Sequence, residues 1–275
     1  MSKRRKTMTN KTYQKKHELW LGILFASFAI EDESIKSRLY DFSQIAFRHM
    51  KWLGESLLES GDDYNYDREM RLIKRDSVFE VLNPLKEEIK TIQELYPNSA
   101  LGERMKTDDA YLLTYLRELL EDESNNKKVT AFDMSRKWED LDQEQIDALT
   151  LFLFDESYKE YELILIYAYM QARTKNLLHY NIFQDLVDES HFHLKSFGNM
   201  MAKLGILALP RELHEMTYVV KDLDKFVKDG IDEEIAAKEM CKELSDAIKD
   251  EKLSKFFDFI NFQENYHIEL MKKLL

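Results

Sequence analysis

The segment KLSKFFDFINFQENYHIELMKKLL, residues 252–275, decides the fold that we expect for this chain. Its apolar residues recur at helical spacing, and they are Leu253, Phe257, Ile260, Ile268, Met271, Leu274 and Leu275. At about 100° per residue, Glu264 falls near the centre of this apolar stripe and His267 near one edge. Positions i and i+3 share a helix face, so both side chains can reach one point. A carboxylate and an imidazole that face a core need partners, and a metal ion is one such partner.

Composition predicts an all-α chain without internal disulfides. The 275 residues include only three prolines and seven glycines, and Leu, Glu, Lys and Met are abundant, which favours helices throughout. A net charge of −12 argues against nucleic acid as a partner. The single cysteine, Cys241, excludes an internal disulfide framework and suggests a reducing, cytoplasmic compartment. No apolar run reaches about 18 residues, so we expect no membrane partner.

The N-terminus admits two interpretations. Residues 1–16 are strongly basic and residues 19–30 are largely apolar, which is the pattern of a secretory signal peptide. Against that interpretation, His17 and Glu18 interrupt the approach to the apolar stretch, and the segment has a counterpart later in the chain. We therefore expect a disordered basic arm over residues 1–12, followed by a helix.

The chain contains an internal repeat at an offset of 144 residues. Residues 18–61 and 162–205 align without a gap, and the matched pairs are Glu18 with Glu162, His49 with His193, Lys51 with Lys195, Gly54 with Gly198 and Gly61 with Gly205. Because glycine is rare in this chain, two matched glycines at one offset are hard to attribute to chance. We interpret the repeat as a duplicated helical hairpin.

Spacing within the repeat indicates antiparallel helices. About 30 residues separate Glu18 from His49, and equally Glu162 from His193, so a helix of about 15 residues out and another back return the chain to one level. We expect helices over residues 13–31, 34–60, 66–95, 103–122, 144–174, 177–204, 211–228, 231–249 and 252–275. They divide into an N-terminal helical bundle over residues 13–125, a linker over 126–145 and a C-terminal bundle over 146–275.

The second half resembles the ferritin-like superfamily of rubrerythrin type. Proteins of that superfamily bind two iron or manganese ions through Glu on the first and third helices and Glu-x-x-His on the second and fourth. Here Glu162 fits the first position, Glu234 fits the third with Glu233 as a competitor, and the pair Glu264 and His267 fits the fourth. The resemblance covers about residues 150–275 and, more weakly, the first half. It implies an all-α fold of two tandem ferritin-like four-helix bundles.

The second helix of the pattern departs from the superfamily. Ser190 stands three residues before His193, where a glutamate belongs. Glu189, four residues before His193, can reach the site from a turn away, and we favour this pair. The alternative is Asp188 with His191, although Asp188 then points away from the apolar stripe. The expected metal ligands are Glu162, Glu189, His193, Glu234, Glu264 and His267.

The first half departs further, because Ala46 stands three residues before His49. A site built from Glu18, His49, Glu80 and Asp108 is conceivable there. We favour a degenerate half that is retained for packing.

The resemblance implies a metal-dependent oxidoreductase or ferroxidase-like protein that acts on oxygen, peroxide or Fe(II). Its cofactor would be two ions of iron or manganese, which carboxylate and imidazole ligands suit. A rubredoxin-like Cys-x-x-Cys is missing, so electrons would come from a separate donor protein. A homo-oligomer is compatible with the pattern. The alternative is a non-catalytic helical protein that retains the fold for partner binding or iron handling.

Overall fold

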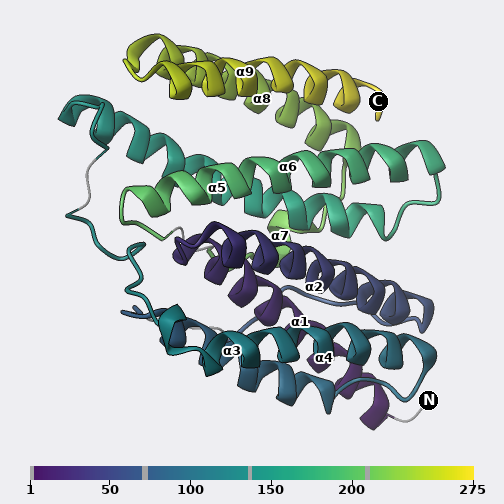
Figure 1. Ribbon diagram of the computed structural model, residues 1–275. Coiled ribbons are helices and arrows are strands. Elements are labelled where there is room, and N and C mark those ends of the chain that lie inside the picture. The colour runs from purple at the N-terminus through teal and green to yellow at the C-terminus, as the bar shows by residue number, and fades with distance from the viewer. Residues whose placement is uncertain (1–2, 70–73, 136–137, 208–210) are drawn as a thin grey trace. The chain divides into compact units, whose positions relative to one another are not determined.

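The computed structural model describes residues 3–275 except 70–73, 136–137 and 208–210, and it describes side chains from residue 10 onward. Over these residues the chain is helical and forms no β-strand; one isolated bridge joins Ser77 and Lys128 (Figure 1). The all-α prediction is therefore confirmed. The chain divides into two compact units, which are residues 1–134 with 205–212 and residues 135–204 with 213–275. The boundary between residues 134 and 135 falls inside the predicted linker, whereas residues 205–212 belong to unit 1 and not to the predicted C-terminal bundle. Each unit is described separately below.

Unit 1 consists of four long helices and one short one. They are α1 (Lys3–Ala29), α2 (Glu33–Glu59), α3 (Val78–Gln93), α4 (Ala100–Glu121) and the 3-10 helix η1 (Glu123–Asn125). Helix α1 packs against α2 and α3, and α4 packs against α3 and α2. The core is built around α1, on which Trp20, Leu24 and Phe28 are fully buried. The apolar stretch that resembled a signal peptide is thus a core helix of this unit.

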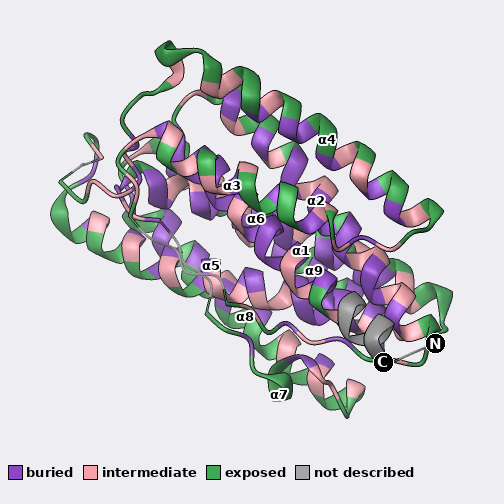
Figure 2. Ribbon diagram, turned by 90° about the horizontal axis from the view of Figure 1, so that it is seen from below, coloured by how far each residue is buried: buried purple, intermediate pink, exposed green. Residues whose placement is uncertain are grey.

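Unit 2 repeats this plan with a longer third long helix, since α8 (Leu223–Ala247) has 25 residues and α3 has 16. Its elements are α5 (Gln143–Gln171), α6 (Leu177–Lys203), the single turn α7 (Glu215–Tyr218), α8 (Leu223–Ala247) and α9 (Glu251–Lys272). Helix α5 packs against α6, α7 and α8, and α9 packs against α8 and α6. Burial follows the sides of the helices that face their neighbours (Figure 2). Tyr167, Phe197 and Phe257 are among the most completely buried side chains.

The internal repeat appears in the bounds of the helices. Helices α2 and α6 begin at Glu33 and Leu177 and end at Glu59 and Lys203, so both ends keep the offset of 144 residues. The side chains at the matched N-caps, Asp32 and Asn176, each accept two backbone N–H groups of the first turn.

The matched glycines at the C-terminal ends of these helices have the same conformation. Gly61 and Gly205 have φ values of 79° and 73°, the left-handed region that glycine adopts readily after a helix. A Cβ atom on Gly205 would lie 1.8 Å from the carbonyl oxygen of Asp133, whereas one on Gly61 would meet nothing within 4 Å. The positive φ value therefore favours glycine at both positions, and at Gly205 the lack of room for a Cβ atom requires glycine as well.

Several expectations for individual segments are wrong. The disordered arm does not extend to residue 12, because α1 begins at Lys3 and the fully buried Thr12 hydroxyl donates to the Leu95 carbonyl at 2.9 Å. The third helix begins at Val78, not at residue 66, and of residues 66–77 the range 70–73 lies outside the described residues. The helix expected over residues 211–228 is interrupted, because it consists of the single turn α7 and, from Leu223 onward, the start of α8.

The break expected at Gly230 does not occur either, because α8 runs through it. A Cβ atom at Gly230 would lie 2.4 Å from the terminal methyl group of Met271, so this glycine permits close packing of α8 on α9.

None of the helices described here is both long and apolar enough to span a membrane.

Candidate metal centre

The hairpin of α5 and α6 places a histidine against a glutamate in the interior of unit 2. His193 on α6 is fully buried, and its Nδ1 lies 2.8 Å from Oε1 of Glu160 on α5, which is 5% exposed. Burial lowers the pKa of His193, but the adjacent Glu160 carboxylate outweighs it and raises that pKa to about 9. The other ring nitrogen, Nε2, lies 3.3 Å from Oε1 of Gln263. In this arrangement the imidazolium donates from both nitrogens.

The hairpin of α8 and α9 brings a second set of ligand-type atoms together. Glu234, Glu264 and His267 are all buried, and one ligand atom from each lies within 4.8 Å of the other two. His267 Nδ1 is 2.8 Å from Glu264 Oε2 and 3.8 Å from Glu234 Oε2. Two carboxylates and an imidazole therefore meet at one point, as the i, i+3 spacing of Glu264 and His267 predicts.

His267 also connects this set to α6. Ligand-type atoms of Glu189, His193 and His267 form another group within 4.8 Å, and the rings of His193 and His267 lie 5.4 Å apart. Gln263 holds the outer part of this group in place, because its Nε2 donates to Glu189 Oε2 at 2.7 Å while its Oε1 faces His193. The two groups share His267 and combine side chains of α6, α8 and α9. Helix α5 joins this polar interior through the contact of Glu160 with His193.

Without a metal ion, the carboxylates of this interior differ in how strongly they hold protons. Burial raises the pKa of Glu264, and burial likewise raises the pKa of Glu156, one turn before Glu160, to about 7. Burial also raises the pKa of Glu234, but its contacts with His267 and Glu264 outweigh this and lower it overall. These two carboxylates raise the pKa of His267 to about 11 against the effect of burial. Like charges at close range therefore share protons as one coupled system.

Two buried side-chain atoms of this interior lack a hydrogen-bond partner, and both are of a type that can bind a metal ion. Glu160 Oε2 and His267 Nε2 are buried and form no hydrogen bond with any described residue. Buried polar atoms without partners are costly, and a cation would satisfy the carboxylate oxygen while a deprotonated imidazole nitrogen could coordinate it. Oxygen and nitrogen donors of this kind suit iron or manganese. On these observations the residues present fit a metal centre.

The structure brings together five of the six residues that the sequence predicts as ligands: Glu189, His193, Glu234, Glu264 and His267. Glu162 is half-buried and belongs to neither group. Glu160 also belongs to neither group, but it contacts His193 and faces the interior in place of Glu162, because two residues along a helix turn the side chain by about 200°. The competitor Glu233 is exposed, and so is Asp188, which accepts a hydrogen bond from Gln184. His191 is turned to the Val187 carbonyl at 2.8 Å, so the arrangement favours Glu189 with His193 over Asp188 with His191.

Glu160, which contacts His193, is the residue that the sequence interpretation missed. The repeat itself carries a signal for it, since the residue matched to Glu160 is Lys16 and the residue matched to His193 is His49. When the two repeats are aligned, a lysine matched to a glutamate does not count as similarity. The identical pair Glu18 and Glu162 is therefore chosen as the candidate instead.

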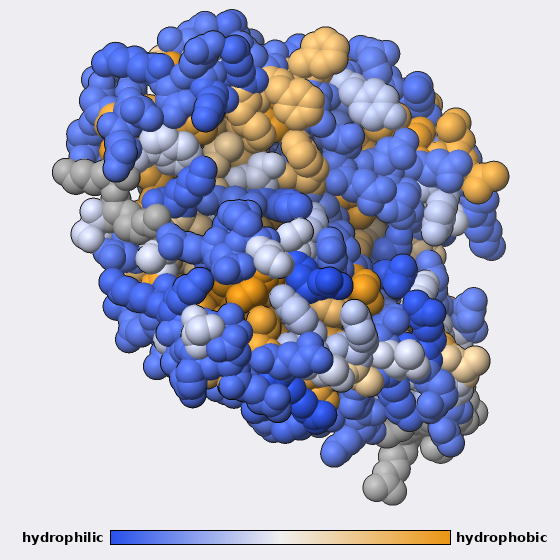
Figure 3. All heavy atoms as spheres, in the orientation of Figure 1, coloured by the Kyte–Doolittle hydropathy of each residue, from blue (hydrophilic) through white to orange (hydrophobic). Residues whose placement is uncertain are grey.

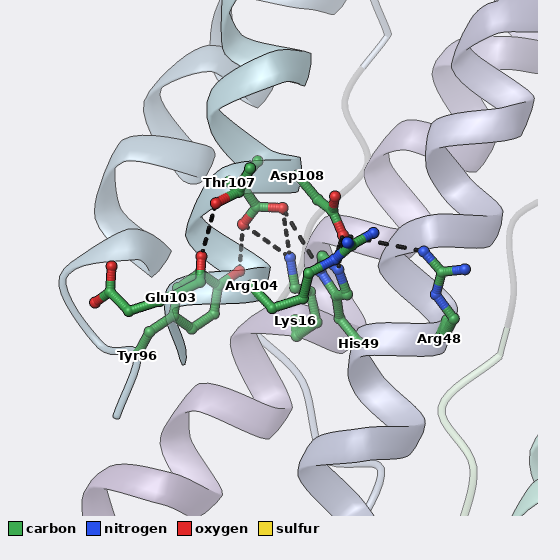
Figure 4. Close-up of polar contacts among 9 residues, drawn as sticks. Lys16, Arg48, His49, Tyr96, Glu103, Arg104, Thr107 and Asp108 are labelled. Carbon is green, nitrogen blue, oxygen red and sulfur yellow. Dashed lines mark hydrogen bonds and ion pairs between the residues drawn. The ribbon is translucent and has the colours of Figure 1, made fainter. Parts of the chain in front are cut away.

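Unit 1 has a different polar cluster at the equivalent place (Figure 4). Lys16 is fully buried, and its Nζ donates to both carboxylate oxygens of Asp109 at 2.9 Å. His49 Nε2 lies 3.0 Å from Asp108 Oδ2, and the Tyr96 hydroxyl donates to Asp109. Burial, with a further contribution from Lys16, lowers the pKa of His49 to about 4, so this imidazole is neutral. The buried cation that faces Asp109 is the ammonium of Lys16, whose pKa is lowered by burial, while Arg104 and Arg48 face Asp108 from more exposed positions.

The site considered for the first half is only partly assembled. His49 meets Asp108, but Glu18 accepts hydrogen bonds from Lys15 and from the backbone N–H of Glu69. Glu80 is exposed at the start of α3 and accepts from the backbone N–H of Asp76. Among the described residues, both groups with metal-binding geometry lie in unit 2.

No family model matches the chain, and neither a curated protein nor a solved structure is significantly similar to it.

Proposed function

We propose that unit 2 is a ferritin-like four-helix bundle that binds two iron or manganese ions through Glu160, Glu189, His193, Glu234, Glu264 and His267. The observation that carries this proposal is the convergence of these side chains from four helices, with buried ligand atoms that lack partners. Unit 1 would be a second bundle of the same ferritin-like type without metal. The chain would act as an oxidoreductase or ferroxidase-like protein, with oxygen, peroxide or Fe(II) as substrate.

Bound iron or manganese would supply one-electron oxidation and reduction. The protein's own contribution is to position ligands, manage protons and exclude water. His193 would exchange the proton of one ring nitrogen for a cation, while the other ring nitrogen keeps its hydrogen bond to Glu160 or Gln263 and so holds the ring in place. Glu264, whose pKa is raised by burial, would release its proton as positive charge arrives. Phe197 and Phe257, both fully buried, restrict water in the same interior.

Metal titration of the purified chain tests this proposal. Apo protein should take up two equivalents of Fe(II) or Mn(II) under anaerobic conditions, as followed by calorimetry and elemental analysis. Glu264→Ala should abolish most of this uptake, whereas Glu18→Ala in unit 1 should leave it unchanged. Uptake that survives Glu264→Ala but is lost with Glu18→Ala would place the site in unit 1 and contradict the proposal.

A non-catalytic helical protein that binds a partner is the second candidate. Apolar side chains reach the surface over α6 and α9, and they include Phe192, Phe259 and Phe262, of which Phe262 is 74% exposed (Figure 3). Exposed aromatic groups of this kind mark interaction surfaces. Two results together would favour this candidate: the purified protein takes up no metal, and its association with a partner protein is lost in Phe262→Ser.

A further inference from the structure

A cavity of about 390 Å³ lies on the face of unit 2 formed by α5 and α8. Its walls are mostly apolar and include Leu151, Phe152 and Met240. Three carboxylates also line it, Asp155, Glu156 and Glu243, and no basic residue is among the described residues that line it. A cavity with one sign of charge and low-dielectric walls concentrates cations.

Glu156 occupies the inner part of this cavity. Asp155 and Glu243 are exposed, whereas Glu156 is only 7% exposed and forms no hydrogen bond with the described residues. It is one helical turn before Glu160, so both carboxylates project from the same side of α5. Glu160 in turn contacts His193. A row of carboxylates therefore extends from the cavity mouth to the centre.

We propose that this cavity is the path by which divalent metal ions reach the centre, with Glu156 as a transient ligand on the way. Asp155 and Glu243 would attract the hydrated ion, and Glu156 would replace part of its water before Glu160 takes it. Oxygen ligands of this kind suit hard divalent cations. The positive charge of Lys159 next to Glu156 opposes passage, and three carboxylates outweigh it. This inference rests on the proposed metal centre.

The experiment measures rate and extent of loading separately. Apo full-length protein is mixed with Co(II) in a stopped-flow instrument, and its visible absorption reports the ion inside the protein. Glu156→Gln should slow loading by about tenfold, since electrostatic focusing contributes 10-fold or more to association rates. The final absorbance and the equilibrium dissociation constant should stay within about twofold of wild type. A residue of the path changes the rates of metal entry and metal release by the same factor, so their ratio is unchanged.

Two further variants control for other effects. Leu151→Trp narrows the cavity from an exposed position on α5 and should slow loading without removing a charge. Glu239→Gln removes one negative charge from α8 at an exposed residue outside the cavity, and it should load like wild type.

Each contrary outcome identifies what fails. A lower final amount of Co(II) in Glu156→Gln would make Glu156 a permanent ligand and overturn the path. Wild-type loading rates in both Glu156→Gln and Leu151→Trp would also overturn it. Wild-type protein that takes up no Co(II) would contradict the metal centre itself.

Discussion

The α1–α2 hairpin of unit 1 and the α5–α6 hairpin of unit 2 solve one electrostatic problem in two ways. Both place a fully buried histidine, His49 or His193, on the second helix. Opposite it, unit 1 has Lys16 and unit 2 has Glu160, at matched positions of the repeat. In unit 1 the ammonium of Lys16 balances Asp109, so the positive charge belongs to the chain. In unit 2 carboxylates are in excess and need protons or a cation from outside.

This difference teaches that the residue at one repeated position changes the charge balance of the surrounding interior. A buried charge without a partner costs several kcal/mol, so neither cluster can exchange this residue alone without compensation. The groups with metal-binding geometry also need Glu234, Glu264 and His267 from the last two helices of unit 2, so this single position does not account for them.

The largest expected effect comes from removing the internal cation of unit 1. Lys16→Met should destabilise the protein by about 3–5 kcal/mol, because Asp109 is left buried without its ammonium partner. Urea unfolding followed by circular dichroism measures this. The double variant Lys16→Met with Asp109→Asn should recover much of the loss, since it removes both charges. A cost of less than about 1 kcal/mol for Lys16→Met would show that the pair is not an essential buried charge pair.

Metal should stabilise unit 2 by a smaller amount. Added Fe(II) or Mn(II) at a hundred times its dissociation constant should contribute about 2.7 kcal/mol and raise the melting temperature of apo protein at neutral pH. Because binding the ion displaces protons from Glu264, His193 and His267, whose pKa values are all raised, the gain should decrease as the pH falls below about 9 and should be much smaller at pH 5 than at pH 7. Thermal melts at pH 7 and pH 5 with and without Mn(II) check this. Glu264→Ala should show no gain, and a full gain in that variant would contradict the ligand assignment.

The register of α5 can be tested by a matched pair of variants. Glu160→Gln should weaken Mn(II) binding by about 10- to 100-fold, the range for residues that bind or orient ligands, whereas Glu162→Gln should change it little. Calorimetric titration of the two variants measures the difference. Stronger weakening by Glu162→Gln would restore the ligand that sequence alone indicated.

The sequence predicts the helical hairpins well and the residues on α9 best. Glu264 and His267 lie on a narrow apolar stripe, so periodicity alone directs them inward. Helix α5 offers no such guide, because from Ile164 to Tyr169 every residue is buried and all sides of the helix are apolar. The identity of Glu18 and Glu162 in the repeat then decides which residue of α5 is predicted as a ligand, and the prediction falls two residues from Glu160. Gly230 was similarly misinterpreted, since packing against Met271 cannot be inferred from local sequence.

The smallest expected effect tests whether the two units unfold separately. Asp32 and Asn176 are matched N-caps of α2 and α6, and each accepts two backbone N–H groups. Asp32→Ala and Asn176→Ala should each cost about 1 kcal/mol, the usual value for losing such a cap. Calorimetry with Mn(II) present distinguishes them, because only unit 2 is expected to gain stability from metal. If the units unfold independently, Asp32→Ala lowers a transition that does not respond to metal, and Asn176→Ala lowers one that does. A single transition that both variants shift equally would mean that the repeated hairpins unfold as one cooperative unit, so that metal bound in one also stabilises the other.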